Sequence, residues 1–425
     1  MCTVATKIEF IGAMQVLDSR GNPTVLATVR TKLGTTKAIT PSGASTGKFE
    51  ALELRDGGKD FGGKGVSKAV ANVNGSIAKK LIGMDVEEQE KLDNAMIALD
   101  GTEGKSVLGA NATTAVSMAV ARAGALAQGK ELYDYITGIY KPKTTGLIPV
   151  PMLNVINGGK HASGGLACQE VMIQPSFAKN YTVALRESVE SYHGLKKAIS
   201  GKFGGTFTNL GDEGGFVPPV KTMGDAFALC LGAVANLGYE NDFTIAIDPA
   251  SSNFYENGKY AVDNKSLSSA ELAKYYTQLE GEYPLRSVED GFQEEGYDEF
   301  AAFTKANKYQ VVGDDLLVTN PIRIKKAIAM KACNALLLKI NQIGTVTEGM
   351  QAARLAQQAG WNVVVSHRSG EGEDSFIADF AVGIGAGQIK TGAPARAERT
   401  CKYNRLLEVE AMLGNKARYQ SPFRK

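Results

Sequence analysis

Six ionisable residues each close a short β-rich run in the second half of the chain. The runs are FTIAID, LRSVE, YQVVGD, NALLLK, NVVVSH and GQIK, and their last residues are Asp248, Glu289, Asp314, Lys339, His367 and Lys390. Successive residues of this set are 41, 25, 25, 28 and 23 positions apart, which is about the length of one strand, one helix and two loops. The strands of a (β/α)8-type barrel end at one mouth, where barrel enzymes react. We therefore expect these six side chains to gather at one site.

Three of these residues are carboxylates on neighbouring predicted strands, namely Asp248, Glu289 and Asp314. Crowding three anions costs free energy unless a cation lies among them. Oxygen ligands without Cys or clustered His favour Mg2+ over zinc. The sequence therefore predicts a magnesium site. Any one charged residue after an apolar run, taken alone, is more often just the end of a strand that meets water.

Positive charge lies beside the predicted metal site. It comes from Lys339, Lys390 and the segment SHRS at residues 366–369. These cations suit a substrate with several negative charges, such as a carboxylate together with a phosphate. The alternative for residues 366–369 is a solvated loop held by internal ion pairs.

Length and composition set the class of protein. The chain has 425 residues, 44% of them hydrophobic, and 48 glycines, which indicates an α/β enzyme of two domains, one large enough to be a barrel. Its 47 basic and 45 acidic side chains leave a net charge of only +2. That balance gives no field strong enough to imply a nucleic acid or an anionic membrane. We expect a small-molecule substrate.

Cysteine usage and hydropathy indicate a cellular location. The five cysteines are far apart and form no CxxC pair, so neither a disulfide framework nor a thiolate metal site is predicted. The first residues lack the apolar segment of a signal peptide, and no apolar run approaches a membrane span. A soluble protein of the reducing cytoplasm is expected.

The chain divides into two predicted domains. Residues 5–40 alternate as strands do, with a turn at 19–23, and helical patterns then continue to about residue 127. The segment TGIYKPKTTGLIPVP is typical of a connection between domains. We predict an α+β domain at residues 1–139 and a barrel at 140–425.

Ten segments, in one order along nearly the whole chain, carry a resemblance to a known family. They are LDSRGNPTV, SGASTGKFEALELRDG, NGGKHASGG, CQEVMI, GDEGGF, SVED, GDDLLVTNP, LLLKINQIGT, SHRSGEGED and GQIKTGAP. Together they resemble enolases. The resemblance implies an N-terminal capping domain, a TIM-type (β/α)8 barrel whose first strands depart from simple alternation, and interconversion of 2-phosphoglycerate and phosphoenolpyruvate with two Mg2+ per active site.

The resemblance also implies roles for individual residues. Lys339 matches the base that removes the C2 proton, and Glu213 matches the acid that protonates the departing 3-hydroxyl. The implied metal ligands are Asp248, Glu289, Asp314 and, for the second ion, Ser45. The implied substrate-binding residues are His161, Gln169, Glu170, Glu289, Asp314, Ser366, His367, Arg368, Ser369 and Lys390.

The chemistry explains these residue types. A proton next to a carboxylate is very weakly acidic, so the two ions and Lys390 must stabilise the doubly charged aci-carboxylate that forms. Lys339 must lose its proton to act, and Mg2+ with a second ammonium is expected to lower its pKa. Glu213 is expected to need a raised pKa. The stretch PSGASTGK resembles the lid that closes over the substrate, although on its own it is equally consistent with a simple connection.

Several residues depart from the usual pattern of enolases, among them Lys48, Lys160 and Gly372. Phe49 replaces a common His, Asn253 replaces a common acid, and Gly291 replaces a common Pro. We expect these changes to adjust the lid and the contacts near Asp248 and Glu289 without loss of activity.

The dimer surface departs as well. Enolase dimers typically use Arg–Glu pairs, but the matching positions here are Met14 opposite Glu398 and Leu26 opposite Glu408. The usual ion pairs therefore cannot form. A homodimer with a more apolar, altered interface is expected, with a weaker or monomeric variant as the alternative.

Two other functions stay open at this point. One is a related lyase or epimerase acting on a different acid, against which Arg368 and Ser369 argue. The other is non-enzymatic surface binding of plasminogen through the terminal Lys425. The remaining histidine, His193, is predicted to be packed or hydrogen-bonded.

Overall fold

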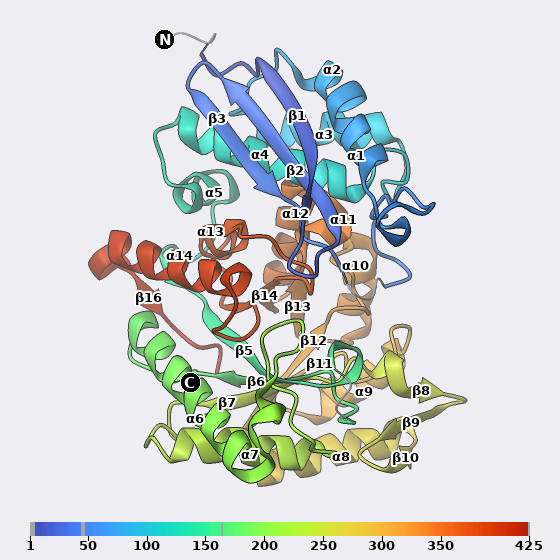
Figure 1. Cartoon of the computed structure of the whole chain (residues 1–425), viewed down its shortest axis with the longest axis vertical. Coiled ribbons are helices and arrows are strands. Elements are labelled where there is room, and N and C mark those ends of the chain that lie inside the picture. Colours follow the sequence, from blue (N-terminus) through green and yellow to red (C-terminus); the bar gives the residue numbers. More distant parts are fainter. Residues whose placement is uncertain (1–4, 44–46, 163–164, 424–425) are drawn as a thin grey trace.

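A small N-terminal domain lies against the mouth of a closed barrel (Figure 1). The computed structural model describes residues 5–43, 47–162 and 165–423, without the side chain of His161. Contacts between the domains include a β-bridge between Ser42 and Gly370, just beyond a barrel strand. The predicted combination of a capping domain and a TIM-type barrel is confirmed.

The capping domain is built on an antiparallel sheet. Its strands are β1 (Phe10–Leu17), β2 (Pro23–Thr31) and β3 (Gly34–Ile39). Alternate residues of β2, such as Val25 and Val29, are fully buried, because the inner face of the sheet packs on the long helix α4 (Ala110–Ala127). The turn between β1 and β2 is held by Asp18, whose Oδ1 accepts from two backbone N–H groups of residues 20–22.

Further helices complete this domain. They are α1 (Ser67–Asn72), which continues through a π-turn at Val73–Ile77 into α2 (Ala78–Leu81), then α3 (Gln89–Asp100) and α5 (Leu132–Tyr140). The predicted division between residues 139 and 140 falls in the last turn of α5 and stays a prediction.

The barrel is closed in the order β11-β12-β13-β14-β15-β5-β6-β7. Its strands are β5 (Val150–Asn157), β6 (Glu170–Gln174), β7 (Thr244–Asp248), β11 (Leu285–Glu289), β12 (Gln310–Gly313), β13 (Ala335–Leu338), β14 (Asn362–Ser366) and β15 (Gln388–Lys390). β6 is antiparallel to both β5 and β7, whereas the other neighbouring pairs are parallel. This is the predicted departure of the first strands from simple alternation.

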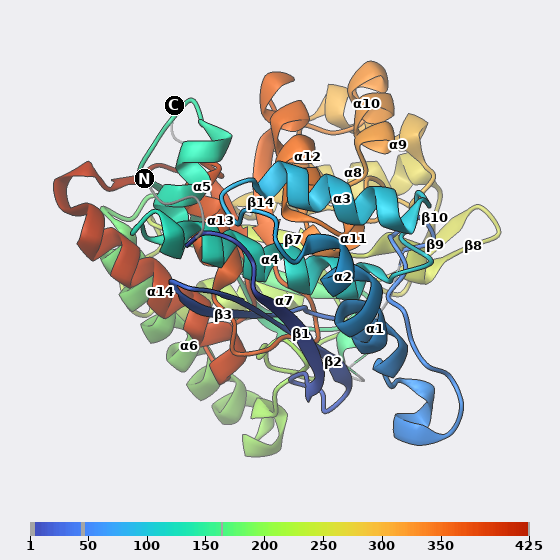
Figure 2. The ribbon, with the colours of Figure 1, turned by 90° about the horizontal axis from the view of Figure 1, so that it is seen from above.

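Helices surround the barrel (Figures 1 and 2). They are α6 (Tyr181–Phe203), α7 (Met223–Ala235), α8 (Ser269–Glu282), α9 (Tyr297–Ala306), α10 (Pro321–Met330), α11 (Ile340–Ile343), α12 (Val346–Gln358), α13 (Phe376–Gly383) and α14 (Ala397–Leu413). Smaller strands lie outside the barrel: β8 (Tyr255–Glu256), β9 (Lys259–Val262) and β10 (Lys265–Leu267) form a sheet, and β4 (Leu147–Ile148) pairs with β16 (Arg418–Tyr419).

Buried polar contacts fix the capping domain on the barrel. Helix α3 lies beside α12 in both views (Figures 1 and 2). Asp93 Oδ2 on α3 accepts from Thr347 N at 3.0 Å and from its Oγ1 at 2.6 Å. A carboxylate at the first turn of α12 satisfies a backbone N–H that the helix itself leaves unpaired. The two domains are therefore held in register where they face each other over the barrel mouth.

None of the described helices combines the length and the apolar composition that a membrane span needs.

Candidate active site

The six strand-end residues lie at one mouth of the barrel. Asp248, Glu289 and Lys390 end β7, β11 and β15, while Asp314, Lys339 and His367 directly follow β12, β13 and β14. A cavity at this mouth is lined by Glu50, Gln169, Glu170, Glu213, Asp248, Ala250, Asp290, Asp314, Asp315, Lys339, Ser366, His367, Arg368, Ser369 and Lys390. Glu289 is fully buried against Lys390.

Lys390 is the centre of a buried cluster of ion pairs. Its Nζ lies 2.8 and 2.9 Å from the two oxygens of Glu289, 3.1 Å from Glu170 Oε2 and 3.3 Å from Asp248 Oδ2. Burial disfavours the charged amine, but the three carboxylates outweigh burial and raise the pKa of Lys390 well above its usual range. Lys390 is therefore a permanent cation.

The three carboxylates around Lys390 share one positive charge. Burial, with the charge of Asp248, raises the pKa of Glu289 well above its usual range. Burial and the neighbouring Glu213 do the same to the pKa of Glu170. A further cation beside this cluster would lower its free energy, so the strand ends are suited to a divalent ion.

Lys339 is paired with Asp314. Its Nζ donates to Asp314 Oδ2 at 2.5 Å, while Asp314 Oδ1 accepts from Gln342 Nε2 at 2.9 Å. Burial would lower the pKa of Lys339, but contact with Asp314 outweighs burial and the opposing charges of Arg368 and Lys390, and raises it. Lys339 in turn holds the pKa of Asp314 below its usual value despite burial. The predicted lowering of the Lys339 pKa requires bound Mg2+ and stays a prediction.

Glu170 reaches the site because β6 runs against its neighbours. It pairs with Asn157 of β5 and with Asp248 of β7. An antiparallel strand begins where the adjacent strand ends, so its first residue lies at the mouth. Gln169, just before it, donates from Nε2 to Asp248 Oδ2 at 3.4 Å. A search for acids that follow apolar runs misses both residues. A search for acids that precede such runs would have found Glu170, which comes directly before VMI.

Glu213 comes from the loop between α6 and α7. Its backbone oxygen accepts from Ala393 N at 2.9 Å, and the next residue, Gly214, has a φ of +84°, which favours glycine. Its Oε2 accepts from Asn154 Nδ2 at 3.0 Å and lies 3.3 Å from His367 Nε2. The motif GDEGG thus places a carboxylate at the mouth without a strand, and Asn154 is a partner that the sequence pattern did not identify.

His367 is held in one tautomer. Arg399 NH1 lies 2.6 Å from its Nδ1, and because a guanidinium only donates, Nδ1 accepts and the ring proton is assigned to Nε2, facing Glu213. Burial lowers the pKa of His367 to about 3, against the opposing effect of Glu213. His367 is therefore neutral, with its Nε2 facing Glu213 Oε2 at 3.3 Å.

Arg399 also fixes the segment at residues 366–369. Its NH1 donates to the backbone oxygen of Arg368 at 2.6 Å, and its NH2 donates to that of Ser369 at 2.5 Å. All four side chains of the segment are buried. The alternative of a solvated loop is therefore excluded, and Arg399 is a positioning residue that sequence reasoning missed because it lies on α14, far along the chain.

Side chains nearly fill the cavity. Its free space is about 30 Å³, which holds roughly two water molecules. Seven carboxylates and three cations line it. A charged ligand can therefore enter only when side chains exchange their present partners for it. Because carboxylates outnumber cations, the cavity favours ligands that include divalent cations.

Two sets of carboxylates compete as metal ligands. Among the described residues, Asp290, Asp314 and Asp315 place one oxygen each within 4.8 Å of one another, which differs from the predicted set of Asp248, Glu289 and Asp314. Both oxygens of Asp290 accept backbone N–H groups, from Asp314 at 3.0 Å and Asp315 at 2.7 Å. Asp290 thus shapes the loop after β12, and the predicted ligand set stays a prediction.

Some predicted residues lie outside the described structure. Ser45 lies outside the described residues, as does the side chain of His161.

Two residues that depart from the family pattern have close neighbours in the structure. Asn253 Nδ2 contacts Gln169 Oε1 at 3.5 Å, and a Cβ on Gly291 would lie only 3.1 Å from Val288 Cγ1. His193, which was predicted to be packed or hydrogen-bonded, is exposed on α6, where its ring makes an edge contact with Tyr192 at a centroid distance of 6.0 Å.

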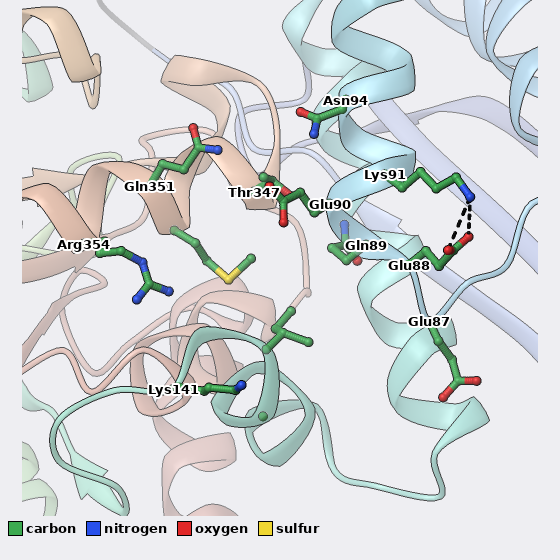
Figure 3. A pocket seen from close by; sticks show the side chains of 13 residues that line it. Glu87, Glu88, Gln89, Glu90, Lys91, Asn94, Lys141, Thr347, Gln351 and Arg354 are labelled. Carbon is green, nitrogen blue, oxygen red and sulfur yellow. Dashed lines mark hydrogen bonds and ion pairs between the residues drawn. The ribbon is translucent and has the colours of Figure 1, made fainter.

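A larger cleft of about 730 Å³ lies elsewhere, between α3, α12 and the end of α5 (Figure 3). Figure 3 shows Lys141 and Arg354 on one side of it and the acids of residues 87–90 on the other. No barrel strand end lines it. This cleft is larger than the cavity at the barrel mouth, but none of the six strand-end residues lines it.

Two family models match the chain. Residues 145–424 match the model described as "Enolase, C-terminal TIM barrel domain" and residues 8–136 match "Enolase, N-terminal domain". Proteins named "Enolase" from Methanococcoides burtonii and Methanocaldococcus jannaschii are 51% and 53% identical, over 97% and 96% of both chains. One from Thermococcus gammatolerans is 51% identical over 98% of this chain and 99% of its own.

The pKa of His367 predicts a specific pH response. Because the folded ring stays neutral down to about pH 3, while the unfolded ring takes up a proton near pH 6.5, acidification below pH 6.5 costs stability through this group. The chain has three histidines, so NMR of protein with labelled histidine can follow each ring, with His367→Gln to assign the signal. The His367 ring signal should not shift between pH 5 and 8, and a titration midpoint inside that window would contradict the assignment.

Proposed function

The chain belongs to the enolase family, and from this we infer that it is a phosphopyruvate hydratase, a carbon–oxygen lyase that interconverts 2-phosphoglycerate and phosphoenolpyruvate. The observation that carries this function is that Lys339 and Glu213 line one buried cavity together with carboxylates and Arg368. A reaction that removes a proton and a hydroxyl from adjacent carbons needs a base and an acid in one site.

The metal-binding residues that we propose are Asp248, Glu289 and Asp314, with Ser45 for a second ion. The donor set supports Mg2+, because the three described ligands offer only carboxylate oxygens, at adjacent strand ends, among more carboxylates than cations. Bound Mg2+ supplies positive charge that stabilises the developing anion of the substrate carboxylate and offsets the carboxylates that now support the Lys339 ammonium.

Lys339 is the residue that we propose as the base for the C2 proton. It lies at the end of β13, and its backbone N donates to Thr319 Oγ1 at 3.0 Å, so the strand end fixes where the side chain begins. Its present partner is Asp314. If Asp314 bound a cation, the Lys339 ammonium would lose the contact that raises its pKa, which would favour the neutral amine that a base requires.

Glu213 is the residue that we propose as the acid for the departing hydroxyl. Asn154 and the neutral His367 both contact its Oε2, so one oxygen is fixed in place. Ser369 Oγ lies 3.5 Å from the other oxygen, Oε1. Lys390 and the buried strand-end cluster then provide the fixed positive charge beside which the substrate carboxylate can bind.

Arg368 and Ser369 are proposed to receive the phosphate, with Gln169, Glu170, Ser366 and His161 as further substrate contacts. A planar guanidinium suits a phosphate group. We also propose that the activity belongs to glycolysis and gluconeogenesis in the cytoplasm, which the family membership supports. Nothing among the described residues favours another acid as substrate, and Lys425, which would bind plasminogen, lies outside them.

Two variants separate the proposed acid and base. Lys339→Ala should lower both turnover and exchange of the C2 hydrogen with D2O by about 10³-fold, because both need the base. Glu213→Gln should lower turnover comparably while exchange persists, because proton removal does not need the acid. Absorbance of the enol phosphate reports turnover and NMR reports exchange, with Mg2+ present. Turnover in excess EDTA, or exchange that survives Lys339→Ala, would contradict the mechanism.

We also propose that the enzyme is a homodimer with an altered interface. Met14 is exposed and pairs across the sheet with Leu26, so the outer face of the capping sheet offers apolar surface. Glu398 and Glu408, which would meet arginines of a partner in the usual interface, form ion pairs with arginines of their own chain. Because Met14 and Leu26 stand where the usual interface has arginines, apolar contact with the partner is the interaction available at these two positions.

Light scattering over a dilution series tests this interface. At micromolar concentration the mass should be that of two chains. Met14→Glu should shift dissociation to at least about tenfold higher concentration, because a charge would replace buried apolar area. A mass of one chain at micromolar concentration, or no effect of Met14→Glu on the midpoint, would contradict the proposal.

A further inference from the structure

Glu50 is a cavity residue to which the family resemblance assigned no role. Among the described residues that line the cavity, it alone comes from the capping domain. It lies on the four-residue turn that begins at Gly47, on the side of the cavity occupied by Arg368. The capping domain thus contributes a carboxylate to a site that is otherwise built by the barrel.

Glu50 holds the guanidinium of Arg368 with both oxygens. Arg368 NH1 donates to Glu50 Oε2 at 2.8 Å, and NH2 donates to Oε1 at 3.3 Å. NH1 also donates to Asn341 Oδ1 at 3.2 Å. The side chains of Glu50 and Arg368 are only 6% and 4% exposed, so solvent screens this pair little. A buried guanidinium needs an anion, and in this structure Glu50 is an anion that it contacts.

The turn keeps Glu50 in place independently of Arg368. Glu50 N donates to the backbone oxygen of Gly47 at 3.1 Å, and Gly47 N donates to Glu50 Oε1 at 2.9 Å. The guanidinium carbon of Arg323 lies 4.0 Å from the ring centroid of Phe49. Arg323 is itself fixed, because it donates to the backbone oxygens of Leu316 and Glu294. Phe49, where enolases commonly carry His, thus anchors this turn to the barrel.

A phosphate group that binds Arg368 would compete with the carboxylate of Glu50. Phosphate and Glu50 are both anions that bind the same guanidinium, and they repel each other when they share it. The cavity is narrow, with room for about two water molecules, so a phosphate that binds Arg368 competes with Glu50 for it. The net free energy of phosphate binding is therefore the gain from contact with Arg368 less the free energy of displacing Glu50.

We propose that Glu50 sets the affinity of the active site for the phosphate group, by acting as the carboxylate that phosphate must displace from Arg368. The inference rests on the proposed function, in which Arg368 receives the phosphate. Its consequence is that the site binds the phosphate ends of substrate and product less tightly than an unopposed buried arginine would, which speeds their release.

The variant Glu50→Gln tests the proposal. Glutamine keeps the size of the side chain and an oxygen that can accept from Gly47 N and from Arg368, but it removes the competing charge. The dissociation constant for inorganic phosphate, measured by calorimetry at fixed Mg2+ and salt, should fall about tenfold. KM for 2-phosphoglycerate should fall with it, and kcat should not rise.

Glu53→Gln is the matched control. It removes the same charge three residues along, from a side chain that pairs with Arg55, and should change phosphate affinity less than about twofold. An unchanged or weakened affinity in Glu50→Gln would overturn the proposal, since that is what a residue that only orients Arg368 would give. Phosphate binding is measured without turnover. A chain that failed to convert 2-phosphoglycerate would therefore refute the proposed function, while the effect of Glu50→Gln on phosphate affinity could still be interpreted.

A second measurement needs no variant. In a crystal structure of the unaltered chain with inorganic phosphate, the phosphate should contact Arg368, and Glu50 should have left hydrogen-bond distance of both NH1 and NH2. Phosphate on Arg368 with both Glu50 contacts retained would overturn the proposal even if Glu50→Gln did not fold.

Discussion

The buried ammonium of Lys390 is the interaction on which the barrel mouth depends. It brings together Glu170 at the start of β6, Asp248 at the end of β7 and Glu289 at the end of β11, all within 3.3 Å of one nitrogen. Three buried carboxylates without that cation would repel one another strongly. Lys390 reduces this repulsion and so allows the cluster to be buried. Because one positive charge does not balance three carboxylates, the cluster is also suited to additional cations.

The three cations that line the cavity are each paired with a carboxylate of the chain. Lys339 contacts Asp314, Arg368 contacts Glu50, and Lys390 contacts its three carboxylates. We propose that each ligand replaces a partner that the protein already supplies. A divalent ion would take carboxylates from ammonium groups, and a phosphate would take a guanidinium from a carboxylate. The pKa of Lys339 illustrates this. Contact with Asp314 raises that pKa, whereas burial alone would lower it.

The sequence predicted those parts of the site that follow from strand period and strand direction. Residues at the ends of parallel strands, such as Asp248 and Lys390, could be placed because such strands all end at one mouth. Glu170 could not be placed in that way, because its strand is antiparallel, and Glu213 could not because a glycine-rich loop carries it. Glu50 and Arg399 come from another domain and from a distant helix, and no local pattern reports a contact across 318 or 32 positions. The fold followed from alternation and length, whereas these contacts depend on packing.

The location of a bound divalent ion tests the central claim most directly. Crystals soaked in Mn2+ would show the ion by its anomalous scattering. Our account predicts a peak that contacts oxygens of Asp248, Glu289 and Asp314, with Lys390 moved away from at least one of them. A peak held by Asp290, Asp314 and Asp315, the group that lies closest together in this structure, would contradict it, as would Lys390 retaining all its carboxylate contacts with no ion among the strand ends.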